Sequence, residues 1–116
     1  MSRILAVQQR AYGANQVLVV TGEVDMTSAP LLKSALEQAL GVHPAVLVVD
    51  MSKVEFFGSA GMSVLIAASD GQPDTLRIVP SFAVRRPLEV AALDQLLDLF
   101  DSVEAALAAG GTPPVG

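Results

Sequence analysis

The feature that most constrains the fold is the stretch of residues 45–68, where two apolar runs flank a turn of small residues. Ala45 to Val49 is a short β-branched run, which is typical of a fully buried strand. Met62 to Ala68 is apolar on nearly every side, which predicts a helix buried by more than one neighbour. Between them, the sequence Gly58-Ser-Ala-Gly61 has almost no side-chain bulk. We therefore predict a strand, a tight turn and a helix, with Ser59 exposed at the helix start.

Ser59 has two interpretations. The start of a helix has unpaired N–H groups and the positive end of the macrodipole, so it favours an anion or a hydroxyl oxygen. Serine is therefore a common N-cap residue, and the spacing alone favours this interpretation. The second interpretation is that the Ser59 hydroxyl is a chemical handle, for example a phosphate acceptor.

The remaining chain alternates strand-like and helix-like segments. Two β-rich runs, residues 3–7 and 16–20, flank a Gly/Asn turn at residues 12–15 and predict an antiparallel hairpin. Helices are predicted after an N-cap at Ser28 up to Gly41, over residues 82–90 despite Pro87, and after a capping box that begins at Asp101. Strands are predicted at residues 75–79 and 96–100, and residues 70–73 form a polar loop. This order predicts an α/β fold with a largely parallel sheet.

Length and composition limit the classes of protein. At 116 residues the chain has room for one domain, which we place at residues 1–109, followed by a disordered tail at residues 110–116. Seven basic against twelve acidic side chains give a net charge of −5, which argues against direct binding of nucleic acid. The chain has no cysteine, no signal peptide and no apolar run near the ~20 residues of a membrane helix, so we expect a cytoplasmic protein without membrane association or metal.

Two motifs resemble those of a known family. Asp50-x-Ser52, Val54, Phe56 and then Ser59-Ala60-Gly61 before an apolar helix resemble the STAS domain, and more narrowly the bacterial anti-sigma factor antagonists. Gly22-Glu-Val-Asp25 is similar to the Gly-Glu-Leu-Asp that closes a strand in that family. Without the family, Asp25 would be interpreted as a turn carboxylate that accepts hydrogen bonds from its own backbone.

The resemblance implies a right-handed βα superhelix with an N-terminal hairpin and a largely parallel mixed sheet. It also implies a protein that is not an enzyme, needs no cofactor and is a monomer or a weak dimer. The unmodified form is expected to bind an ATP-dependent anti-sigma factor kinase and release a sigma factor, and phosphorylation of Ser59 is expected to switch it off, with a serine phosphatase as a further partner. The expected partner-binding residues are Asp25, Ser28, Gly58, Ser59, Ala60, Gly61 and Met62.

Two alternatives concern the same serine. The family turn usually has aspartate before the serine, and here that residue is Gly58, so an interaction or ligand-binding module that is never phosphorylated is one alternative. A serine on a strand-to-helix turn is also typical of a hydrolase nucleophile, but that motif needs glycine two residues earlier, where this chain has Phe57. Its base would have to be His43, the only histidine, and no triad spacing is present.

Overall fold

The structure of the protein, a computed structural model, describes residues 4–70 and 75–109. These residues contain a five-stranded sheet in the order β1-β2-β3-β4-β5. The strands are β1 Ala6–Tyr12, β2 Asn15–Val24, β3 Leu47–Phe57, β4 Leu76–Pro80 and β5 Asp98–Leu99. β1 and β2 form the predicted antiparallel hairpin, and each later pair of neighbours is parallel. The predicted α/β class is confirmed.

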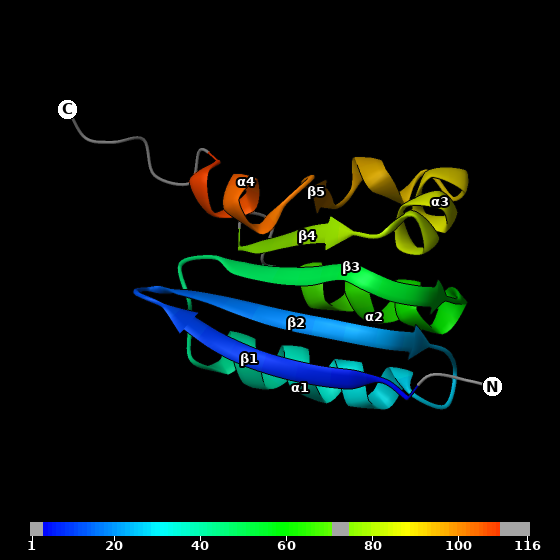
Figure 1. Cartoon of the computed structure of the whole chain (residues 1–116), viewed down its shortest axis with the longest axis horizontal. Helices are drawn as coiled ribbons and strands as arrows, with labels where there is room; N and C mark the ends of the chain where they lie inside the picture. The colour runs from blue at the N-terminus through cyan, green and yellow to red at the C-terminus, as the bar shows by residue number, and fades with distance from the viewer. Residues whose placement is uncertain (1–3, 71–74, 110–116) are drawn as a thin grey trace.

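Helices cover both faces of the sheet, but unequally. They are α1 Ala29–Gly41, α2 Ser59–Ser69, α3 Phe82–Val90, the 3-10 helix η1 Leu93–Gln95 and α4 Val103–Ala108. Figure 1 shows α1 and α2 behind the sheet and α4 in front of it, with α3 at the end towards which β2, β3 and β4 point. The main core lies under α1, α2 and α3, and a smaller apolar cluster lies under α4.

The alternation of side chains in β2 and in the first half of β3 explains the two cores. Leu18 and Val20 of β2 face the main core, whereas Val17 faces the cluster under α4. Leu47 and Val49 of β3 likewise face the main core, and Val48 faces α4. Successive residues of a strand point to opposite faces, so a continuous apolar run is what a sheet covered on both sides requires.

The second half of β3 is irregular. The register between β2 and β3 shifts twice. Val19 pairs with Asp50 but Thr21 pairs with Lys53, and Gly22 pairs with Val54 but Glu23 pairs with Phe56. At each shift β3 contains one residue more than the segment of β2 beside it. These irregularities place Val54 in the main core, whereas strict alternation after Met51 would have placed charged side chains there.

Two serines support this irregular segment. The Asp50 carboxylate accepts hydrogen bonds from the Ser52 amide at 3.1 Å and the Ser52 hydroxyl at 2.7 Å. Ser81, the N-cap of α3, donates from its amide to the Met51 carbonyl and from its hydroxyl to the Val54 carbonyl, at 3.1 and 2.7 Å. The start of α3 is therefore fixed to the part of β3 that leads into the turn before α2.

A buried arginine joins α4 to the sheet. Arg77 of β4 is 7% exposed, and its Nη1 donates to the carbonyl oxygens of Ala106 and Ala109, at 2.6 Å each. These carbonyls lie at the C-terminal end of α4, where a positive charge is favoured by the helix macrodipole. Its guanidinium also lies 5.7 Å from the centre of the Phe100 ring. The hydrogen-bond acceptors for the buried Arg77 guanidinium are therefore carbonyl oxygens at the end of α4.

Several predicted boundaries are confirmed and others are corrected. The helix over residues 82–90 is present despite Pro87, and the short last strand lies within residues 96–100. The first strand begins at Ala6 rather than Arg3, and β3 runs on to Phe57 rather than ending at Val49, because its irregular pairing lets it continue along β2. The N-cap of α4 is Ser102, whose hydroxyl accepts from the Ala105 amide at 3.0 Å, and not Asp101.

The helix predicted at residues 62–68 is present and packs against more than one neighbour, as predicted, but it is less buried than its apolar sequence indicates. In α2 only Gly61 and Leu65 are buried, because α1 and the sheet cover one side of the helix and leave the opposite side open. The predicted tail at residues 110–116, most of the predicted loop at residues 70–73 and the residue Arg3 lie outside the described residues.

Candidate functional site

Ser59 is the first residue of α2, and it is exposed as predicted. The N-cap of the helix is Gly58, whose amide donates to the Val24 carbonyl at 3.0 Å. The N-cap interpretation of Ser59 is therefore wrong by one position. Within the described part of the chain the Ser59 hydroxyl forms no hydrogen bond. A free hydroxyl at the first turn of a helix is available to an incoming group.

Gly61 explains why this turn consists of small residues. A Cβ atom at Gly61 would lie 2.5 Å from Cε1 of Phe57 and 2.8 Å from Cγ1 of Val24, and both side chains are buried. Such distances are far shorter than ordinary carbon contacts, so α2 can approach β2 and β3 this closely only with glycine at this position. The close packing holds the first turn of α2, and with it Ser59, at the ends of two strands.

The loop after β2 presents Asp25. Its Oδ1 accepts hydrogen bonds from the Ser28 amide at 2.9 Å and the Thr27 amide at 3.0 Å, and it lies 3.1 Å from the Ser28 hydroxyl. These donors, above all the Ser28 amide, hold the pKa of the Asp25 carboxyl below its usual value. Asp25 is therefore a turn carboxylate that accepts hydrogen bonds from its own backbone, as its position in the sequence predicts when the family resemblance is left aside.

Ser28 fixes the same loop from within. It is the N-cap residue of α1, as predicted, but its hydroxyl makes no cap bond to the helix. Instead the Ser28 hydroxyl accepts from the Asp25 amide at 3.0 Å and lies 2.9 Å from the Glu23 carbonyl. Ser28 is partly buried and shapes the Asp25 loop rather than presenting its hydroxyl outward.

A shallow depression of about 400 Å³ brings most of the predicted site residues together. It is lined by Asp25, Met26, Phe56, Gly58, Ser59, Ala60 and Ser63. Asp25 follows β2 and Gly58 follows β3, and because these strands are parallel neighbours their carboxyl ends meet at one edge of the sheet. The two motifs of the sequence thus form one surface, although they are far apart along the chain.

The depression also contains residues that the sequence analysis missed. Met26 is 83% exposed and Phe56 is 50% exposed. The signal for Phe56 was the pair Phe56-Phe57, because two adjacent residues of a strand cannot both face one core. Ser63 was expected to be inaccessible in a largely buried helix, but it is exposed one turn after Ser59, and its hydroxyl donates to the Ser59 carbonyl at 3.2 Å.

A second depression, of about 900 Å³, begins at the same serines and runs along the outer side of α2. Apolar side chains of α2 and of the segment around η1 form most of it, among them Met62, Ile66, Leu93 and Leu96. The predicted Met62 therefore lies beside Ser59 but on this second surface, and Gly61 is buried beneath both. Ser59 and Ser63 line both depressions, so they separate two largely apolar surfaces.

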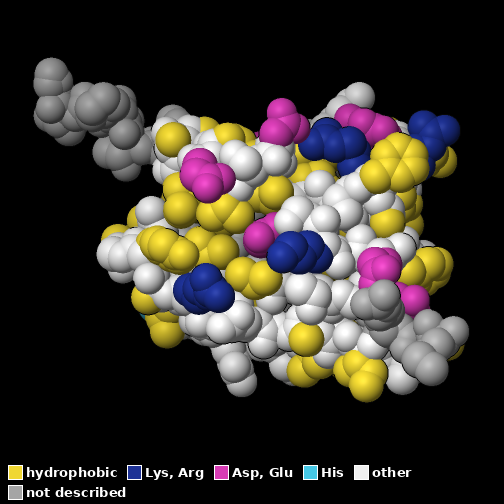
Figure 2. All heavy atoms as spheres, viewed as in Figure 1, with side chains coloured by type: hydrophobic (Ala, Val, Ile, Leu, Met, Phe, Trp, Pro, Cys, Tyr) yellow, Lys and Arg dark blue, Asp and Glu magenta, His cyan; other side chains and the backbone are white. Residues whose placement is uncertain are grey.

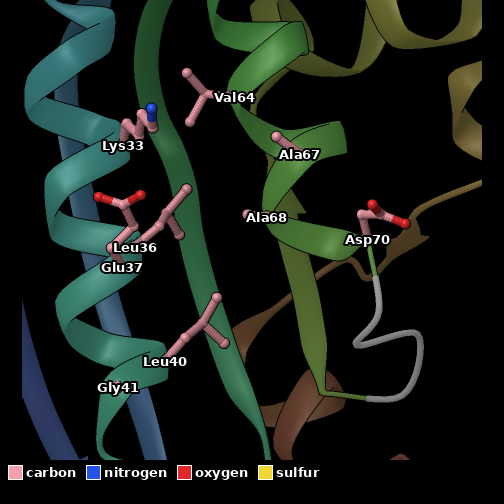
Figure 3. Close-up of a pocket in the computed structure, with 9 residues that line it drawn as sticks. All are labelled: Lys33, Leu36, Glu37, Leu40, Gly41, Val64, Ala67, Ala68 and Asp70. Atoms are coloured by element: carbon pink, nitrogen blue, oxygen red, sulfur yellow. The ribbon is translucent and has the colours of Figure 1, made fainter.

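A third pocket lies between α1 and α2 and shares no residue with the depression around Asp25. Figure 3 shows Leu36 and Leu40 of α1 pointing towards α2, with Lys33 and Glu37 near the rim. Its volume is about 360 Å³. None of the predicted site residues lines it.

The geometry does not support a hydrolase. His43 lies in the loop before β3, whereas Ser59 follows the far end of this 11-residue strand. A strand of that length spans about 35 Å, so His43 cannot reach the serine. Among the described residues, no group of three or more His, Cys, Asp or Glu side chains could hold a metal, and no helix is long and apolar enough to cross a membrane.

Comparison with known proteins agrees with this fold. The family model described as "Mlab, STAS domain" matches residues 7–99. The match covers well over half of the chain, and the chain therefore belongs to the STAS-domain family.

The relatives narrow the class further. The anti-sigma-F factor antagonist RsfB of Mycobacterium tuberculosis is 37% identical over 94 residues, which are 78% of this chain and 77% of that protein. The crystal structure of an anti-sigma factor antagonist from Mycobacterium paratuberculosis superposes with a TM-score of 0.85 at 32% identity, over 91% of this chain and 93% of that one. The anti-sigma factor antagonist SpoIIAA, in its unphosphorylated form, shares the fold with a TM-score of 0.67 at 16% identity, over 86% and 92%.

Proposed function

We propose that this protein is an anti-sigma factor antagonist that is controlled by phosphorylation of Ser59. Its unphosphorylated form binds an ATP-dependent anti-sigma factor kinase and so releases a sigma factor. The kinase transfers phosphate to Ser59 and ends the interaction, and a serine phosphatase restores it. The observation that carries the proposal is the free, exposed hydroxyl of Ser59 at the first residue of α2, in a chain that is 37% identical to an anti-sigma-F factor antagonist.

The surroundings of Ser59 explain how one phosphate would act as a switch. A phosphoserine carries a charge of about −1.5 to −2 at neutral pH. In the free protein this charge would lie at the N-terminal end of α2, where the helix macrodipole stabilises it. In a complex it would be desolvated between two largely apolar depressions and near the Asp25 carboxylate. The modification would therefore oppose binding without unfolding the free protein.

The test uses the purified protein and each ATP-dependent anti-sigma factor encoded in the same genome. We expect one of them to bind the unmodified chain and, with ATP, to phosphorylate it at Ser59. Ser59→Ala should bind and accept no phosphate. Ser59→Glu should bind at least tenfold more weakly, which is about 1.4 kcal/mol, and the phosphorylated chain should bind more weakly still.

Mapping of the phosphate by mass spectrometry decides between the two forms of the proposal. Phosphate on a different serine would contradict the role of Ser59. Binding without any phosphate transfer would favour the alternative, a STAS module that is not phosphorylated. That alternative has one specific observation in its favour, which is Gly58 in the position where the family usually has aspartate.

A further inference from the structure

Phe56 and Gly58 form an unusual pair beside Ser59. Gly58 has φ −94° and ψ −177°, which is extended backbone that any residue adopts. Glycine is therefore not required at position 58 by the backbone. A Cβ atom at this position would lie 3.3 Å from Cε2 and 3.6 Å from Cζ of the Phe56 ring. The ring of Phe56 thus leans over the place that a side chain at position 58 would enter.

The surface around this pair is poor in charge. Among the described residues, Asp25 is the only charged side chain that lines the depression containing Phe56, and its Oδ1 already accepts hydrogen bonds from the amides of Thr27 and Ser28. In the neighbouring depression Asp70 is the only charged residue among those that the structure describes. Exposed apolar side chains lie on both sides of Ser59, with Met26 at 83% and Leu96 at 68%.

Figure 2 shows hydrophobic side chains spread over the visible face, and some of them lie beside acidic side chains at the right-hand end, where β2 and β3 finish in Figure 1. Aromatic residues and methionine are enriched at the cores of protein interfaces, and a few such residues supply most of the binding energy. A half-exposed phenylalanine next to an exposed methionine has this character.

We propose that Phe56 is an anchor residue for the anti-sigma factor, and that Gly58 leaves the space in which its ring is held. The partner would receive the ring in an apolar pocket of its own, so that complex formation depends on burial of apolar surface and little on charge. This inference rests on the proposed function. The inference concerns how the anti-sigma factor recognises the surface next to Ser59. At position 58, where the family turn usually has a carboxylate, this chain has glycine.

The anti-sigma factor is the expected partner because the Phe56 ring lies on the same continuous surface as Ser59. Phe56, Gly58 and Ser59 line one depression, so a kinase that reaches the Ser59 hydroxyl must cover the Phe56 ring as well. Phe82 is even more exposed, at 80%, but it lines neither depression beside Ser59. The two phenylalanines therefore form a matched pair, of which only Phe56 belongs to the proposed contact.

The experiment uses the anti-sigma factor that binds the wild-type chain and measures its affinity for each variant. All measurements are made well below the melting temperature of the variant. Phe56→Ala should weaken binding at least tenfold, whereas Phe82→Ala should change it less than about twofold. Gly58→Asp should also weaken binding, because its Cβ displaces the ring and its carboxylate brings charge into an apolar contact. The wild-type affinity should change less than about threefold between about 50 mM and 500 mM NaCl.

The outcomes separate this inference from the proposed function. If no anti-sigma factor binds the wild-type chain, the proposed function fails and the inference fails with it. If one binds, but Phe56→Ala binds as tightly as wild type or both phenylalanine variants lose affinity equally, the anchor is refuted and the function stands. Tighter binding by Gly58→Asp, or a steep loss of affinity with salt, would show that the partner recognises charge at this turn.

Discussion

Gly61→Ala is the most direct test of the packing that positions Ser59. The new methyl carbon would lie 2.5 Å from Cε1 and 2.9 Å from Cδ1 of Phe57, and 2.8 Å from Cγ1 of Val24. Phe57 and Val24 are 4% and 0% exposed, so neither side chain can move aside into solvent. Overpacking of this kind costs about 1–3 kcal/mol. The loss exceeds the gain of up to about 1 kcal/mol that alanine brings to a helix in place of glycine.

After the helix gain is subtracted, the expected net loss of up to about 2 kcal/mol corresponds to a melting temperature lower by up to about 8 °C, at about 4 °C per kcal/mol for a domain of this size. Gly61→Val should lose more, because valine adds two further carbons to the same space. Gly41→Ala is the matched control, since a Cβ at Gly41 would meet none of the described residues within 4 Å apart from its chain neighbours and its own helix backbone. Thermal unfolding followed by circular dichroism measures all three variants. If Gly61→Ala melts as high as Gly41→Ala, then Phe57 and Val24 yield easily and the turn does not depend on glycine.

Three further predictions concern the elements around the site. Ser81→Ala should lower the free energy of unfolding by about 1–2 kcal/mol in urea, because the Val54 carbonyl and the first turn of α3 lose a partner. Arg77→Met should cost about 2–4 kcal/mol and speed amide exchange in α4, because two carbonyls lose their charged donor. The folded pKa of the Asp25 carboxyl is lowered from 3.8, so this carboxylate should add stability above about pH 4 that is lost as the pH falls through the folded pKa. The melting temperatures of wild type and Asp25→Asn should therefore converge as the pH is lowered below 3.8.

Each of these has a result that contradicts it. Ser34 is exposed on α1, and if Ser34→Ala destabilises the protein as much as Ser81→Ala, the bonds of Ser81 are not the cause. Unchanged exchange rates in α4 after Arg77→Met would show that the helix is held by its apolar cluster alone. A constant difference in melting temperature between wild type and Asp25→Asn at all pH values would exclude a lowered pKa in the folded state.

The sequence alone predicted the order of elements well, because the signals for it are local. The turn at residues 12–15, the helix at residues 82–90 and the small residues of Gly58-Ser-Ala-Gly61 all act through their immediate neighbours. The meeting of Asp25 with Ser59 was also predictable, since the carboxyl ends of parallel neighbouring strands share one edge of the sheet. The helix start at Ser59 was predictable from the local sequence, because the small residues 58–61 stand between two apolar runs.

Exposure around the serine was decided only by the tertiary structure. An apolar segment such as residues 62–68 does not reveal how many neighbours cover it, and α2 has α1 and the sheet on one side and an open groove on the other. Ser63 is therefore exposed and Ile66 is only partly buried, although both lie in an apolar segment of the sequence.

The course of β3 was also decided by tertiary structure. From Met51 onward, strict alternation would point Lys53 and Glu55 into the core, so the local pattern gave no reason to continue the strand beyond Val49. Two irregular pairings with β2 bring Val54 inward instead and let the strand run on to Phe57. Because register depends on the partner strand and not on the local sequence, only the folded sheet could place Phe56 outward beside Ser59.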